Sequence, residues 1–137
     1  MNRLEVRMGY RHAGDTAILS KEFRFDAAHT LERVIETESS RRIHGHSYRA
    51  EVVLRGRADP QTGMVVDLGV FEEAIHETRN DLDHRFLDEI NDLGPATMEN
   101  LSAWIWRRLS PKFPNLWRVT VKRDSDMGAC AFYGPDA

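Results

Sequence analysis

The chain has 137 residues, of which 41% are hydrophobic and 30% charged, and its formal net charge at pH 7 is -3. This length and balance predict one globular domain and exclude an intrinsically disordered chain. The longest uninterrupted apolar run is the five residues 129–133, far short of the ~20 that a membrane-spanning helix needs. The near-balanced charge predicts no surface for nucleic acid or anionic lipid. Small molecules and further copies of the chain are the expected partners.

The N-terminal sequence and the cysteine content indicate the cellular compartment of the protein. The first twenty residues contain no apolar segment of the kind that directs secretion. The one cysteine, Cys130, cannot form an internal disulfide, which is typical of a reducing compartment. We therefore expect a cytoplasmic protein, with residues 1–16 as an N-terminal extension and residues 17–137 as a single domain.

Two alternating segments open this predicted domain. Residues 17–29 alternate polar side chains with a set that includes Phe23 and Phe25, which indicates a strand with one buried face. Residues 48–57 alternate again and end at a turn-forming Asp-Pro-Gln-Thr-Gly stretch. The two segments are predicted to pair as a hairpin.

Two helices are predicted in the middle of the chain. Apolar residues recur at helical spacing over residues 68–81, where Asp67 is a plausible N-cap. A second apolar stripe runs over residues 98–109 and ends at Pro111.

The C-terminal part completes the predicted fold with two more strands, at residues 116–121 and 129–133. The order ββααββ indicates an α+β domain, in which a four-stranded antiparallel sheet carries two helices on one face. Such a sheet has two open edges, so association between subunits is expected.

Three of the six histidines can converge on one point. His44 and His46 open the second strand at positions i and i+2, so their side chains leave the same face with Cα atoms ~6.6 Å apart. His29 ends the first strand and lies near them if the hairpin forms. Three neutral imidazoles match a catalytic zinc centre with one open position. In the alternative, His44 and His46 are solvated while His29 packs beside Phe25.

Two acidic residues have a functional and a structural interpretation. Asp83 next to His84 can fix the tautomer of the imidazole and raise its basicity, provided that the chain has left the helix there. Alternatively, His84 only stabilises a helix C-terminus. Glu99 either recognises a polar ligand edge or is an acid in a first helical turn.

A series of motifs resembles the family of 6-pyruvoyl-tetrahydropterin synthase and 6-carboxytetrahydropterin synthase. The motifs are FDAAH (25–29), HGHSY (44–48), TGMVVDL (62–68), LDHRFL (82–87) and ATMENLSAWIW (96–106), followed by a closing strand pair. Together they span essentially the whole chain.

The resemblance implies a tunnelling fold, in which trimers close a barrel and two trimers usually form a hexamer. A homotrimer or homohexamer is therefore expected. By the same resemblance, the pterin-binding segment includes Thr97 and Glu99, the catalytic pair is Asp83 and His84, and the zinc ligands are His29, His44 and His46.

The implied substrate is 7,8-dihydroneopterin triphosphate. In the family's chemistry, zinc acts as a Lewis acid on the side-chain hydroxyls, a cysteine base and the Asp-His pair move protons, and triphosphate is eliminated. The pyruvoyl branch retains the side chain as a diketone. The carboxy branch releases acetaldehyde and yields 6-carboxytetrahydropterin, a precursor of queuosine-type deazapurines.

One departure from the family concerns the base. The family's catalytic cysteine stands four residues before the first histidine of HGH, where this chain has Ser40. A serine hydroxyl ionises far above the ~8.5 of a thiol and needs activation by a neighbour. Either His84 activates Ser40, or Glu38 takes the role, as a glutamate does in some divergent family members.

A second departure concerns the carboxylate that anchors the pterin. Counting forward along the third strand gives Arg123, which has the wrong charge, whereas Asp124 fits if a bulge precedes it. We favour Asp124. Arg42, or Arg41 or Arg33, can supply cationic groups for triphosphate or can be solvated loop charges.

The sequence therefore favours a zinc-dependent lyase of the carboxy branch. The alternatives are the pyruvoyl branch, a dihydroneopterin side-chain aldolase, and a zinc- and pterin-binding protein without catalysis.

Overall fold

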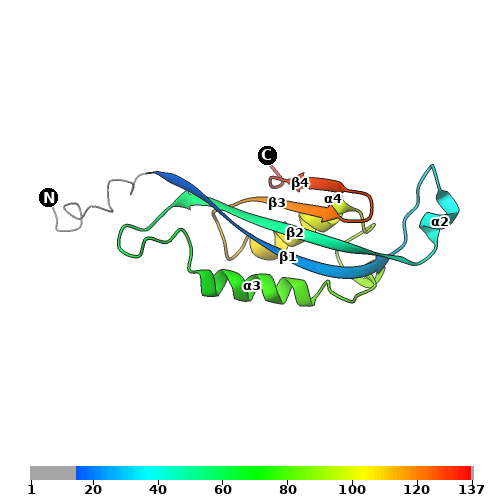
Figure 1. The fold of residues 1–137 in the computed structure, drawn as a ribbon, viewed down its shortest axis with the longest axis horizontal. Helices are drawn as coiled ribbons and strands as arrows, with labels where there is room; N and C mark the ends of the chain where they lie inside the picture. Colours follow the sequence, from blue (N-terminus) through cyan, green and yellow to red (C-terminus); the bar gives the residue numbers. More distant parts are fainter. Residues whose placement is uncertain (1–14, 137) are drawn as a thin grey trace.

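The computed structural model of the protein describes residues 15–136. Its four strands form one antiparallel sheet in the order β1-β2-β3-β4, as the sequence predicts (Figure 1). The strands are β1 (Thr16–His29), β2 (His44–Arg57), β3 (Leu116–Arg123) and β4 (Gly128–Phe132).

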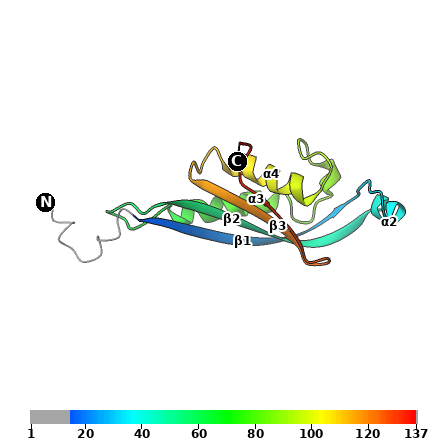
Figure 2. The same cartoon turned by 90° about the horizontal axis from the view of Figure 1, so that it is seen from above.

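The two predicted helices are α3 (Leu68–Asn80) and α4 (Met98–Leu109). Asp67 caps α3, because its side chain accepts hydrogen bonds from the backbone nitrogens of Gly69 and Val70. Thr97 caps α4 in the same way through Asn100. Figure 2 shows α4 lying along one side of the sheet.

The core lies between the helices and the sheet face formed by alternate residues of β1 and β2. Phe23 and Phe25 of β1 and Val52 of β2 are buried there against Phe71 of α3 and Ile105 of α4. This alternation extends to the strand ends, so the histidines at the end of the hairpin share the face of the core.

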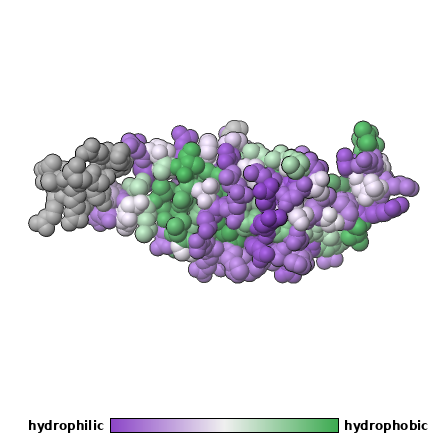
Figure 3. Space-filling view, viewed as in Figure 1, coloured by the Kyte–Doolittle hydropathy of each residue, from purple (hydrophilic) through white to green (hydrophobic). Residues whose placement is uncertain are grey.

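Short elements that the sequence did not reveal lie at the end of the hairpin and beside β1. The charged stretch between β1 and β2 contains the five-residue helix α2 (Thr37–Arg41), and a 3₁₀ helix covers Leu87–Glu89. The space-filling view in Figure 3 shows apolar atoms at the end of the molecule that carries α2, where Val34 and Ile35 are exposed. No helix within residues 15–136 is long and apolar enough to span a membrane.

The outer edge of β1 is partly covered near its C-terminal end. The backbone nitrogen of Ala28 donates to the carbonyl of Arg85 at 3.0 Å, and that of His84 donates to the carbonyl of Asp26 at 2.7 Å. These bonds hold the segment that follows α3 against the strand.

Candidate functional site

Three imidazoles meet where the β1–β2 ladder ends. His29, the last residue of β1, is paired with His44, the first residue of β2, and Ala27 is paired with His46. One ligand atom from each ring lies within 4.8 Å of the others, and the ring centroids are 4.5, 4.9 and 5.0 Å apart. The structure thus brings the three predicted metal ligands together.

Hydrogen bonds orient all three rings in the same way. In each ring Nδ1 is engaged, which leaves Nε2 for a ligand, the arrangement typical of metal-binding histidines. These supporting groups were missed by the sequence analysis. The partners are the carbonyl of Ala96 for His29 (2.8 Å), the carbonyl of Arg42 for His44 (2.7 Å) and Oγ of Ser125 for His46 (2.8 Å).

Two of the three rings have the protonation state that a metal ligand requires, and one of them has an unused ligand atom. Nε2 of His29 is buried without a hydrogen-bond partner in the described part of the chain, which is unfavourable unless a ligand binds it. Burial lowers the pKa of His29, and burial with the neighbouring His29 and Arg123 lowers the pKa of His46 to about 4. Both rings are neutral at pH 7, the form that binds metal. The donor set fits zinc.

Asp83 and His84 form a hydrogen-bonded pair beyond the end of α3. Nδ1 of His84 is 2.9 Å from Oδ2 of Asp83, and Oδ1 of Asp83 accepts from the backbone nitrogen of Asp26 at 2.9 Å. The Asp26 bond, supported by His84 and Arg79, holds the pKa of Asp83 below its usual range. The backbone of His84 has a φ of 59°, so the chain has left the helix there. This geometry agrees with the relay interpretation.

A cavity of about 540 Å³ lies beside this pair, and its lining includes His46, Ser47 and His84. His46, one of the candidate metal ligands, and His84 therefore border the same space. Within residues 15–136, no hydrogen bond or ion pair joins Asp83 or His84 to the three histidines.

The two candidate bases both lie on α2. Ser40 is buried, with 5% of its surface exposed, and its backbone carbonyl accepts from Leu31 at 2.7 Å. Glu38 is exposed in the first turn of α2. Among the described residues, no hydrogen bond or ion pair engages the side chain of Ser40 or Glu38.

The end of β3 differs from the sequence prediction. The ladder runs from Ala50↔Val121 to Tyr48↔Arg123 without a bulge, so Arg123 faces the side of the histidines. Asp124 lies on the other face, where its carboxylate bonds to Arg24 and Arg49, each at 3.1 Å. The expected bulge before Asp124 is therefore wrong, since this stretch of strand keeps its pairing with β2 unbroken.

The remaining predicted binding residues lie around the cluster. Thr97 follows Ala96, whose carbonyl holds His29, and Glu99 is exposed in the first turn of α4. Arg42 adjoins the cluster through its own carbonyl, while its side chain is exposed.

Residues 18–135 match the model of the family described as 6-pyruvoyl tetrahydropterin synthase. A 6-carboxy-5,6,7,8-tetrahydropterin synthase of Synechocystis is 33% identical over 124 residues, which cover 86% of this chain and 94% of that protein. A dihydroneopterin monophosphate aldolase of Pyrococcus furiosus is 34% identical over 107 residues, covering 76% and 87%.

Solved structures of the same family have a similar fold. The 6-pyruvoyl tetrahydropterin synthase of Caenorhabditis elegans superposes with a TM-score of 0.76 at 25% sequence identity, covering 87% of this chain and 96% of that one. The tunnelling fold expected from the sequence motifs is thereby confirmed.

Proposed function

Because the chain belongs to the 6-pyruvoyl tetrahydropterin synthase family, we propose that it is a zinc-dependent lyase that converts 7,8-dihydroneopterin triphosphate to 6-carboxytetrahydropterin, a step toward queuosine-type deazapurines. The observation that carries the proposal is the convergence of three imidazoles whose Nδ1 atoms are all engaged. The likeness to the Synechocystis synthase favours the carboxy branch.

The three histidines would hold the metal. When bound, zinc supplies Lewis-acid polarisation of the substrate's side-chain hydroxyls. His29 is the most enclosed of the three ligands, and the carbonyl of Ala96 fixes its tautomer. Thr97 and Glu99, at the adjacent start of α4, are proposed to contact the pterin.

Proton transfer is assigned to His84. Its ring is 80% exposed, whereas the Asp83 side chain that orients it is only 13% exposed. The carboxylate therefore stays fixed by the backbone of β1 while the imidazole reaches into the neighbouring cavity. An orienting carboxylate of this kind keeps the imidazole in one tautomer.

A second base comes from α2, where Ser40 and Glu38 are the two candidates. Ser40→Ala and Glu38→Ala separate them, with His76→Ala on the exposed side of α3 as a control. The variant of the true base is expected to lose about 100-fold in turnover while its zinc content stays unchanged. Unchanged turnover removes that residue from the mechanism.

The decisive assay incubates the zinc-loaded protein with 7,8-dihydroneopterin triphosphate and identifies the products by mass spectrometry. Acetaldehyde with a carboxylated pterin supports the proposal, and a diketone identifies the pyruvoyl branch. No turnover by protein that holds zinc and binds the pterin indicates a binding protein.

A side-chain aldolase is the second candidate. Two observations favour it: Ser40 replaces the expected cysteine, and the aldolase of Pyrococcus furiosus is 34% identical to this chain. Glycolaldehyde-type fragments in the same assay identify this activity.

We also propose that the chain forms a homotrimer or homohexamer. In the described sheet, the outer edge of β4 pairs with no other strand, and only the C-terminal end of β1 is covered. Pairing between subunits would satisfy these edges. Light scattering coupled to gel filtration measures the mass, and a monomer would contradict this.

A further inference from the structure

A cation lies beside the histidine cluster at the end of β3. Arg123 is paired with Tyr48, two residues along β2 from His46, and shares their face of the sheet. Its side chain is only 16% exposed, and Nη2 donates to Asp126 at 2.6 Å. Nε is buried and has no partner among residues 15–136. Part of the hydrogen-bonding capacity of this guanidinium is therefore unused.

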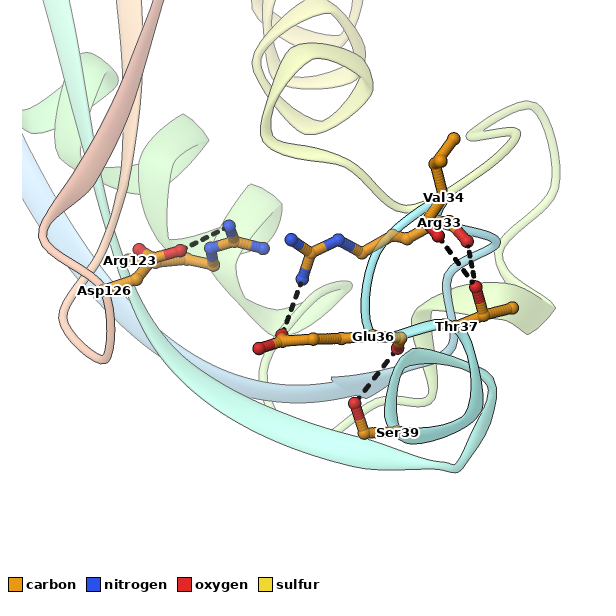
Figure 4. A network of polar contacts seen from close by, with 7 residues as sticks. All are labelled: Arg33, Val34, Glu36, Thr37, Ser39, Arg123 and Asp126. Carbon is orange, nitrogen blue, oxygen red and sulfur yellow. Dashed lines mark hydrogen bonds and ion pairs between the residues drawn. The ribbon is translucent and has the colours of Figure 1, made fainter.

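A second cation, on the segment between β1 and α2, extends toward Arg123 (Figure 4). Figure 4 shows the side chains of Arg33 and Arg123 pointing toward one another. Arg33 is also held from its own segment, because its Nη1 is 3.6 Å from Glu36 and its carbonyl accepts from Thr37 Oγ1 at 2.5 Å.

The acidic partners are placed so that they do not separate the two cations. Glu36 lies on the same segment as Arg33, and Asp126 lies in the turn after β3 (Figure 4). The backbone nitrogen of Gly128, with help from Arg123, holds the pKa of Asp126 below its usual range, so this carboxylate is ionised and engaged. The facing ends of the guanidinium groups carry only donors and like charge.

Two facing guanidinium groups are stabilised by an oxyanion that both can bind. Their forked donors match carboxylate and phosphate geometry. A divalent metal at the neighbouring histidines would add further positive charge, which also favours an anionic ligand. The N–H donors of a pterin amide edge find no acceptor on a guanidinium.

We propose that Arg33 and Arg123 bind an oxyanion of the ligand, a phosphate or a carboxylate. The inference rests on the proposed function only in taking the histidine cluster as the place where the ligand binds. It sharpens that function, because it assigns the end of β3 to recognition of a negative charge and not to an acid that anchors the pterin.

The test measures anion binding directly by isothermal titration calorimetry, in the metal-free and the zinc-loaded full-length protein. The probes are tripolyphosphate and malonate, which separate the two sources of the oxyanion. Arg123→Gln and Arg33→Gln are compared with Arg108→Gln. This control removes the same charge from α4, where Arg108 forms an ion pair with Asp81. Circular dichroism checks that each variant is folded.

We expect each site variant to lower the affinity for one of the probes at least about 10-fold. Arg108→Gln should change that affinity less than about twofold. Arg123→Lys, which keeps the charge but loses the fork, is expected to recover only part of the affinity. If Arg123→Gln fails to fold, the exposed Arg33→Gln carries the test alone.

Unchanged binding of both probes by the folded site variants, or no binding by the wild type, would overturn the inference. The results that contradict the anion site differ from those that contradict the proposed function. Binding that depends on Arg33 and Arg123 without any turnover supports the anion site and contradicts the lyase. Turnover that is indifferent to both arginines supports the lyase and contradicts the anion site.

Discussion

The histidine cluster and the segment that holds the candidate bases adjoin in sequence but are built differently. The cluster lies on a two-stranded ladder that is continuous from Thr16↔Arg57 to His29↔His44. Each of its three rings is also oriented by a hydrogen bond from Nδ1 to its own partner. The bases lie on a five-residue helix whose N-cap residue, Glu36, makes no side-chain capping bond. The candidate metal site is thus supported by the β1–β2 ladder, whereas the candidate bases are positioned only locally. Position 40 lies on α2, outside the sheet.

The largest effect is expected from the loss of one histidine of the cluster. His46→Ala should abolish stoichiometric zinc binding and lower turnover by more than about 100-fold, because loss of a supporting group alone costs about 10- to 100-fold. Metal analysis by mass spectrometry and a turnover assay measure both. His76→Ala, on the exposed side of α3, should behave as wild type. Full zinc occupancy in His46→Ala would contradict the site.

Asp83→Asn tests whether proton transfer is separate from metal binding. The variant loses the charge that orients His84, so turnover should fall about 100-fold while the zinc content stays constant. The matched control is Asp81→Asn, two residues before Asp83, which removes a carboxylate that is paired with Arg108. Loss of zinc in Asp83→Asn would show that the two parts are coupled.

Ser125→Ala removes one of the groups that orient the rings of the cluster. The hydroxyl lies 2.8 Å from Nδ1 of His46, so its loss should weaken zinc affinity about 10-fold. Competition with a chelator measures this affinity. Ser39→Ala on α2, whose hydroxyl donates to the Glu36 carbonyl, is the control and should leave zinc affinity unchanged. Equal affinities in the two variants would refute the supporting role.

The smallest effect is expected from Asp67→Ala, which removes the N-cap of α3. The free energy of unfolding should fall by about 1 kcal/mol, because two backbone nitrogens lose their acceptor. Urea denaturation measures it. Zinc affinity should not change, since α3 contributes no ligand, and a change would mean that the cluster depends on helix packing more than on the strand ladder.

Sequence patterns predicted the regular elements because these depend on periodicity. The strands, the helices α3 and α4 and the pairing of His29 with the HGH segment follow from alternation, helical spacing and a hairpin. Helix α2 has five residues and is too short to show a period.

Elements of the site that depend on tertiary geometry could not be predicted in this way. Every residue carries a backbone carbonyl, so nothing in the sequence singles out Ala96 as the partner of His29. Asp124 is favoured over Arg123 on charge, whereas the side each residue faces is decided by the register of β2 and β3, which is regular from Val53↔Arg118 to Tyr48↔Arg123.

The backbone at His84 has a further consequence for engineering. A φ of 59° is one that glycine adopts freely and that other residues adopt at a cost of about 1 kcal/mol or more. His84→Gly would relieve that backbone cost but would also lose the bond to Asp83 and the proposed proton-transfer group. A variant at this position can therefore keep the fold and lose the proposed activity, so stability screens of this chain need an activity filter.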